Sequence, residues 1–151
     1  MGTTTFSGPV RSGTLKTGET NGPNLGFAVL EQETALTQDS TNAVSSTLYV
    51  PAGSKLVDII VDVLTAFDSG TSATLTVGTT AGGTEYASGV NAKTAGRVRP
   101  TFTAAQLAAM SNVSVLGVAA PTTAPVVVTI TPDGATTAGY VRVTLVYAQL
   151  A

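Results

Sequence analysis

The sequence predicts an all-β protein: a β-sandwich or jelly roll with one short helix, preceded by an extended N-terminal arm. Its hydrophobic segments alternate with period 2 and are rich in Val, Ile and Thr, as half-buried strands are. Pro, Asp and Gly, which favour turns, separate these segments. One helix-capping pattern interrupts the series, so the strands follow one another without the helices that βαβ units require.

The chain has the size of a single domain. A chain of 151 residues can bury roughly two-thirds of the surface that its unfolded form exposes. Charged residues make up 11%, but Thr, Ala, Val and Gly replace them, which is not the composition of a disordered protein. We divide the chain into an arm, residues 1–25, and a β-domain, residues 26–151.

The first strands are predicted from alternation and from the turns that end them. A strand begins after Gly26, with Phe27 and Val29 on one face and Leu30 on the other. A second covers Ser46–Val50 and ends at the turn formed by residues 51–53, Pro-Ala-Gly.

The segment KLVDIIVDVL, residues 55–64, is the clearest strand. Its β-branched content disfavours a helix, and its odd-numbered positions from 57 to 63 are predicted to face the core. Asp58 and Asp62 then lie on the opposite face, beside Ile60 and Leu64. A turn follows at residues 68–70, and the next strand, SATLTVGT, places Leu75 and Val77 inward and its threonines outward.

The second half of the domain is predicted less regularly. Residues 82–99 have the composition of a long loop, in which Tyr86 and Val90 can form a short edge strand. Thr103 to Gln106 match a capping box, and Leu107 with Met110 is predicted to form the apolar face of a two-turn helix. Strands are predicted at residues 112–118, 126–131 and 140–147, with a Pro-Asp-Gly turn at 132–134, which makes seven or eight in all.

The residue inventory argues against an enzyme. The chain contains no His and no Cys, which excludes the usual nucleophile-base pairs, disulfides and nearly all transition-metal sites. Asp58 and Asp62 lie on one strand face, roughly 13 Å apart, beyond the separation that glycoside hydrolysis uses. We interpret both as solvated acids on an outer sheet face.

No cofactor or metal is expected either. Asp39, Asp68 and Asp133 lie in turn sequences, where an Asp side chain bonds nearby backbone N–H groups. A calcium ion bound by several such turns is conceivable, but the spacing of an Asp-x-Asp-x-Asp loop does not occur.

The charge pattern does not favour nucleic acid or a membrane as partner. The formal net charge is −2, and the basic residues are scattered except for Lys93, Arg97 and Arg99, which are close in sequence. Three charges in one predicted loop are more typical of a solvated surface or a subunit contact than of a phosphate site. The apolar runs stay shorter than the ~18 residues of a membrane span.

The arm has little of its own to bury. Its 25 residues can reach ~80 Å when extended, several times the ~14 Å radius of gyration expected for the domain. It is therefore either a disordered tail or a strap that lies on another polypeptide. The single apolar residues Phe6, Val10 and Leu15, with Pro9 and Pro23 favouring extended backbone, suit a strap over a neighbour.

Several stretches carry a resemblance to a known type of protein. These are TTFSGPVRSG, YVPAGSKLVDIIVDVLTAFDSGTSATLTVGTTAGGTEY, YASGVNAKTAGRVRPTFTAAQLAAM and TITPDGATTAGYVRVTLVY. They resemble capsid decoration proteins, also called cement or head-stabilising proteins, of tailed bacteriophages. Residues 34–46, TALTQDSTNAVSS, match nothing in that pattern.

The resemblance implies a structural, non-enzymatic virion protein without cofactors, made in the host cytoplasm and seated on the capsid exterior. It implies a jelly-roll body, a homotrimer, and an arm that contacts neighbouring subunits and the major capsid protein. The alternative is a carbohydrate- or receptor-binding β-sandwich of a phage fibre or surface protein. The candidate partner-binding residues are Phe6, Pro9, Val10, Arg11, Leu15, Arg97 and Arg99.

Overall fold

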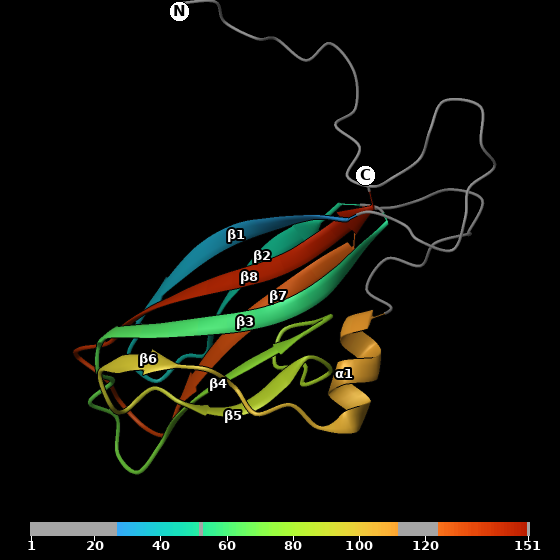
Figure 1. The fold of residues 1–151 in the computed structure, drawn as a ribbon. Coiled ribbons are helices and arrows are strands. Elements are labelled where there is room, and N and C mark those ends of the chain that lie inside the picture. Colours follow the sequence, from blue (N-terminus) through green and yellow to red (C-terminus); the bar gives the residue numbers. More distant parts are fainter. Residues whose placement is uncertain (1–26, 52, 112–123, 151) are drawn as a thin grey trace, which may run out of the picture.

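The computed structural model describes residues 27–51, 53–111 and 124–150, which form a sandwich of two antiparallel sheets (Figure 1). The first sheet has the order β1-β8-β3-β6 and the second β2-β7-β4-β5. The first consists of β1 (Phe27–Thr37), β8 (Tyr140–Leu150), β3 (Ser54–Thr65) and β6 (Gly96–Val98). The second consists of β2 (Val44–Val50), β7 (Ala124–Pro132), β4 (Ala73–Gly78) and β5 (Ala87–Asn91).

The strand pairing is that of a jelly roll. β1 pairs with β8, β2 with β7, β3 with β6 and β4 with β5, as in one long antiparallel hairpin. This hairpin is rolled up, so that β8 also pairs with β3 and β7 with β4. The predicted all-β sandwich is confirmed, and the pairing selects its jelly-roll form.

The core lies between the sheets and matches most of the predicted alternation. Leu75 and Val77 are fully buried in β4, as predicted. The strand predicted at residues 140–147 lies within β8, and its inward face consists of Val141, Val143, Leu145 and Tyr147.

One predicted core position in β3 is wrong. Ile59, Val61 and Val63 are buried as expected, but Val57 is exposed and Leu56 takes the inward position instead. The cause is an irregularity in the pairing with β8 between Leu56 and Asp58, since one extra residue in a strand turns the preceding side chains to the other face.

The region predicted as a long loop, residues 82–99, contains two short strands: β5 confirms the predicted edge strand at Val90, and β6 was not predicted. β5 pairs with β4 and β6 pairs with β3, each at the edge of its sheet. Val90 lies in β5 and Tyr86 just before it, and both are buried. β5 buries only Ala87 and Val90, and β6 has three residues, so neither strand carries a period-2 pattern that the sequence could reveal.

The helix α1 (Ala104–Ser111) begins with the predicted capping box. The Thr103 amide donates to Gln106 Oε1 at 2.9 Å, and the Gln106 amide donates to Thr103 Oγ1 at 3.2 Å. Met110 is buried, but Leu107 is half exposed, so the apolar face predicted for this pair is wrong for Leu107. None of the described helical residues forms a segment long and apolar enough to cross a membrane.

The strand predicted at residues 112–118 and the arm, residues 1–25, lie outside the described residues. With them lie five of the candidate partner-binding residues, namely Phe6, Pro9, Val10, Arg11 and Leu15.

Candidate interaction surfaces

The two ends of the sandwich differ in chemistry. At one end β1 and β3 begin, β2 and β8 end, and α1 lies alongside (Figure 1). Five of the seven large exposed hydrophobic side chains among the described residues lie on β1, β2, β3 and α1 at this end, which we call the apolar end. Its members are Val29, Leu30, Tyr49, Val57 and Leu107.

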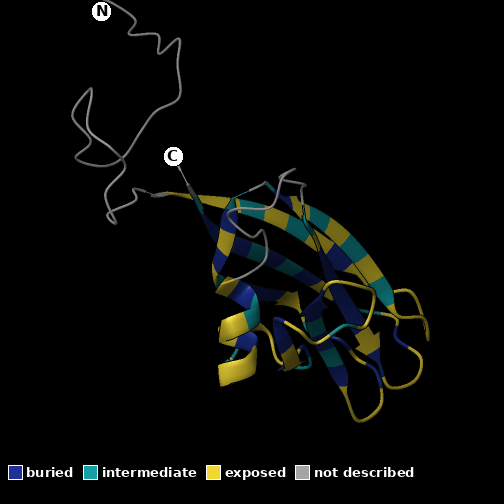
Figure 2. Ribbon diagram, turned by 90° about the vertical axis from the view of Figure 1, so that its right-hand side faces the viewer, coloured by how far each residue is buried: buried dark blue, intermediate teal, exposed yellow. Residues whose placement is uncertain are grey.

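The apolar end is open because the strands run past the part of the core that both sheets cover. Leu30 lies opposite the buried Tyr147, yet is 41% exposed itself. The neighbouring residues of β1 from Ala28 to Glu31 are exposed on both faces, and exposed residues also line α1 (Figure 2). The segment that precedes Phe27 joins the domain at this end.

The opposite end, which we call the loop end, consists of four loops that bond one another. They join β1 to β2, β3 to β4, β5 to β6 and β7 to β8. The backbone amide of Phe67 donates to Ala92 O at 3.0 Å, and that of Gly70 donates to Asp133 O at 2.9 Å. Because each loop is bonded to another, this end is a pre-formed polar cap.

Asp68 is the main hydrogen-bond acceptor of the loop end. Its carboxylate accepts bonds from the Thr137 hydroxyl at 2.7 Å and from the amides of Thr137 and Ala138 at 2.9 and 3.1 Å. These bonds lower the pKa of Asp68 from 3.8 to about 2. Asp68 was predicted to bond backbone N–H groups of its own turn. These partners lie instead in the loop between β7 and β8.

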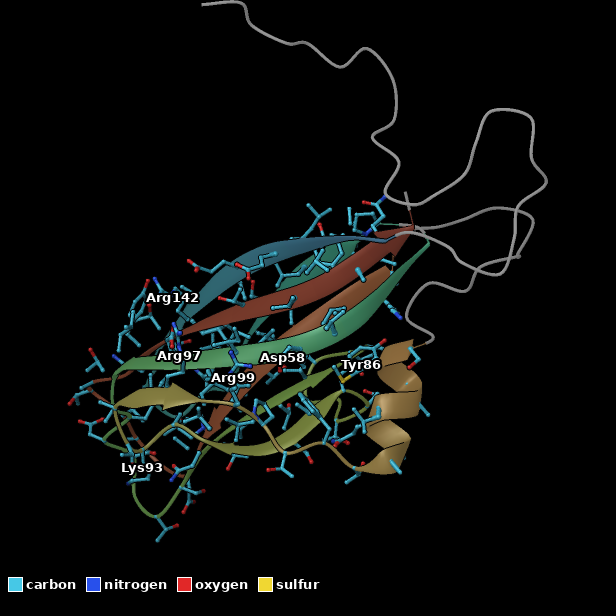
Figure 3. All side chains as sticks on the ribbon, in the orientation of Figure 1. Asp58, Tyr86, Lys93, Arg97, Arg99 and Arg142 are labelled. Carbon is cyan, nitrogen blue, oxygen red and sulfur yellow. The ribbon has the colours of Figure 1, made fainter. Side chains whose placement is uncertain are left out.

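Lys93 also belongs to the loop end. Its Nζ donates to the carbonyls of Ser69 and Gly70, the latter at 2.6 Å. It therefore does not join the side chains of Arg97 and Arg99, with which it is close in sequence (Figure 3).

Arg97 belongs instead to an ionic row on the outer face of the first sheet. Asp62 accepts bonds from Arg97 Nε at 2.7 Å and from Arg142 Nη2 at 2.9 Å, and Arg142 Nε lies 3.4 Å from Glu33 Oε2. The strand register explains these contacts, because Asp62 on β3 lies directly opposite Arg97 on β6 and Arg142 on β8. The interpretation of Asp62 as a solvated acid is wrong, since it is buried and paired.

Arg99 forms a second pair on the same face. Its Nη1 lies 2.5 Å from Asp58 Oδ2. The side chains of Arg97 and Arg99 remain 60% and 63% exposed, so both guanidinium groups reach solvent beyond their aspartates (Figure 3). The structure thus brings these two candidate residues together, at the β6 edge of the sheet.

Asp62 should contribute to stability in a pH-dependent way. Hydrogen bonds from Arg97 and Arg142 hold its pKa below the ordinary value of 3.8, so its contribution is complete above that value and is lost as the pH falls below it. We expect Asp62→Asn to lower the free energy of unfolding at pH 7 by about 1 kcal/mol, a modest value because both guanidinium groups reach solvent. Thermal melts of the two proteins should converge as the pH falls below 4; a constant difference would contradict this role.

The second sheet contrasts with the first, because none of its described strands contains Asp, Glu, Lys or Arg. Its outer face carries hydrogen-bonded hydroxyl side chains instead. Ser45 Oγ bonds Thr129 Oγ1 at 2.9 Å, and the amide of Gly82 donates to the same Thr129 hydroxyl. The loop between β4 and β5 therefore folds back over this face.

Neither a metal site nor an aromatic platform is found within the described residues. No group of three or more acidic side chains there is arranged to hold a metal ion. Tyr86 and Tyr147 are buried, whereas Tyr49 and Tyr140 are exposed at opposite ends of the sandwich.

The comparisons with known proteins give one structural likeness. No family model matches the sequence, and no curated protein matches it. The fold is similar to a chain of the cyanophage Pam1 capsid asymmetric unit, with a TM-score of 0.51 over 90% of this chain and 94% of that chain. The two chains are 21% identical, so the likeness shows a shared fold.

Proposed function

We propose that the chain is a structural protein of a bacteriophage virion, which binds the outer surface of the capsid and stabilises the shell. Two findings support this. The structural neighbour is a chain of a phage capsid asymmetric unit, and jelly rolls are common in viral capsids. The sequence also lacks the His and Cys residues on which most catalytic sites depend.

The observation that carries the proposal is the apolar end. Five large apolar side chains are exposed on the elements of this end, whereas the loop end has two, Leu64 and Tyr140, together with the charged Asp39, Asp68, Lys93 and Asp133. Exposed apolar side chains that gather in one place mark an interaction site, and interface cores are poor in charge. The apolar end is therefore the side that faces the shell, and the loop end faces solvent.

The arm and the homotrimer add avidity to this contact. An arm that precedes β1 starts beside the apolar end, so it can lie on the major capsid protein or a neighbouring subunit while the body docks. Three linked bodies raise the effective concentration of each contact at the shell. The protein would then oppose shell expansion by tying adjacent capsid subunits together.

Deleting residues 2–24 tests the arm. We expect at least about tenfold weaker binding to matching capsids, because the tethered second contact is lost. The measurement is cosedimentation of the variant with purified shells over a range of concentrations. An unchanged melting temperature shows that the body is intact, and an unchanged affinity would remove the arm from the mechanism.

A further inference from the structure

The two lateral sides of the sandwich carry opposite charge. β1 and β2 are the edge strands of their sheets on one side, and β6 and β5 are the edge strands on the other. Residues 27–50, which form the first side, contain Glu31, Glu33 and Asp39 and no basic residue. We call this the acidic side.

The opposite side is basic. Residues 86–111 contain Lys93, Arg97 and Arg99 and no acidic residue. The guanidinium groups of Arg97 and Arg99 bond carboxylates that belong to β3, one strand further in. They remain largely exposed, so the positive charge lies outermost at this edge.

The two sides are too far apart to cancel each other. β1 and β6 are separated by β8 and β3, which amounts to about 14 Å at ~4.8 Å per strand. This exceeds the screening length of about 8 Å at physiological ionic strength. Three charges between them, Asp58 and Asp62 on β3 and Arg142 on β8, are paired with one another or with the edge residues, so they do not remove the difference between the sides.

We propose that copies of this chain associate head to tail, with the acidic side of one copy against the basic side of the next. Two different patches on opposite sides of one subunit are what a heterologous contact requires, and such contacts close into a ring where the rotation between successive copies allows it. A twofold contact of either side with itself would instead bring like charges together. The contact deepens the proposed function, because it gives the homotrimer its subunit interface.

Neutralising the acidic side tests this contact. Glu31→Gln with Glu33→Gln keeps the side-chain shapes, and we expect it to raise the dissociation constant for self-association about tenfold at low ionic strength. Reversal to Lys at both positions should raise it further. The control, Asp133→Asn, removes a negative charge at the loop end, outside both sides, and should leave association unchanged. Sedimentation equilibrium of the full chain measures all four proteins.

Salt provides a second measurement that needs no variant. Raising the ionic strength from about 0.05 M to about 0.5 M should weaken the association of the unmodified protein and have less effect on the doubly neutralised one. A protein that is monomeric at low salt, an association insensitive to salt, or an equal effect of the control variant would each overturn the inference. Capsid binding, measured separately, decides the proposed function independently of this result.

Discussion

Replacing Tyr49 and Leu107 with serine is expected to weaken binding to capsid shells about a hundredfold. Both side chains belong to the apolar end and are at least half exposed in the free protein, at 60% and 50%. Burying the exposed half of such a side chain contributes about 1–1.5 kcal/mol, and two of them contribute about 2.7 kcal/mol, which corresponds to a factor of 100.

The chain offers a matched control at its other end. Leu64 and Tyr140 are also exposed, but they lie at the loop end, where β3 ends and β8 begins. The same pair of residue types changed to serine there should leave capsid affinity unchanged. Titration of labelled protein against purified shells measures both variants, and thermal melts verify that each is folded. Equal losses of affinity would refute the assignment of the apolar end as the docking surface.

Replacing Phe67 with alanine is expected to lower the free energy of unfolding by about 3–5 kcal/mol. Phe67 is 2% exposed and closes the core at the loop end, where its ring packs on Gly139. A Cβ on Gly139 would lie 2.5 Å from Phe67 Cδ1, so the site also has no room to grow. Truncation to alanine leaves a cavity where the ring was. The surrounding loops are held by hydrogen bonds and cannot move in to fill it, so the loss of stability is large.

Urea unfolding of the full chain measures this loss, with Leu64→Ala as the control. Leu64 lies three residues earlier and is half exposed, so its truncation should cost less than about 0.5 kcal/mol. A Phe67→Ala loss below about 1 kcal/mol would mean that the ring is not part of the core.

The parts of the fold that alternation determines were predictable from the sequence. β4 and β8 each pack one face on the core, so their period of 2 identifies both the strand and its inward side. The capping box located α1 for a similar reason, because both of its hydrogen bonds are local. The irregularity after Leu56 in β3 was not predictable, since it depends on the pairing with β8.

The ionic pairs were not predictable because their partners are distant in sequence. Arg97 is 35 residues from Asp62, and Arg142 is 80 residues from it. Alternation correctly placed Asp62 on the outer face, but it could not show that two guanidinium groups cover that carboxylate. Asp68 is a similar case, with partners 69 and 70 residues away.

The apolar end was also missed, because exposure there depends on where the opposite sheet stops covering a strand. Tyr49 belongs to a strand pattern and Leu107 to an amphipathic-helix pattern. Each pattern predicts that one face of its element is buried, so neither indicates an exposed apolar surface. The sequence held one signal for this end: the first strand begins directly after the arm, so the start of that strand marks where the arm joins the domain.

The orientation of the bound protein is the most direct test of its docking. Cryo-electron microscopy of shells saturated with the protein should show the apolar end, with Tyr49 and Leu107, against the capsid and the Asp68 loops pointing to solvent. Density that shows the loop end against the shell, with Tyr49 and Leu107 exposed, would contradict the proposed function.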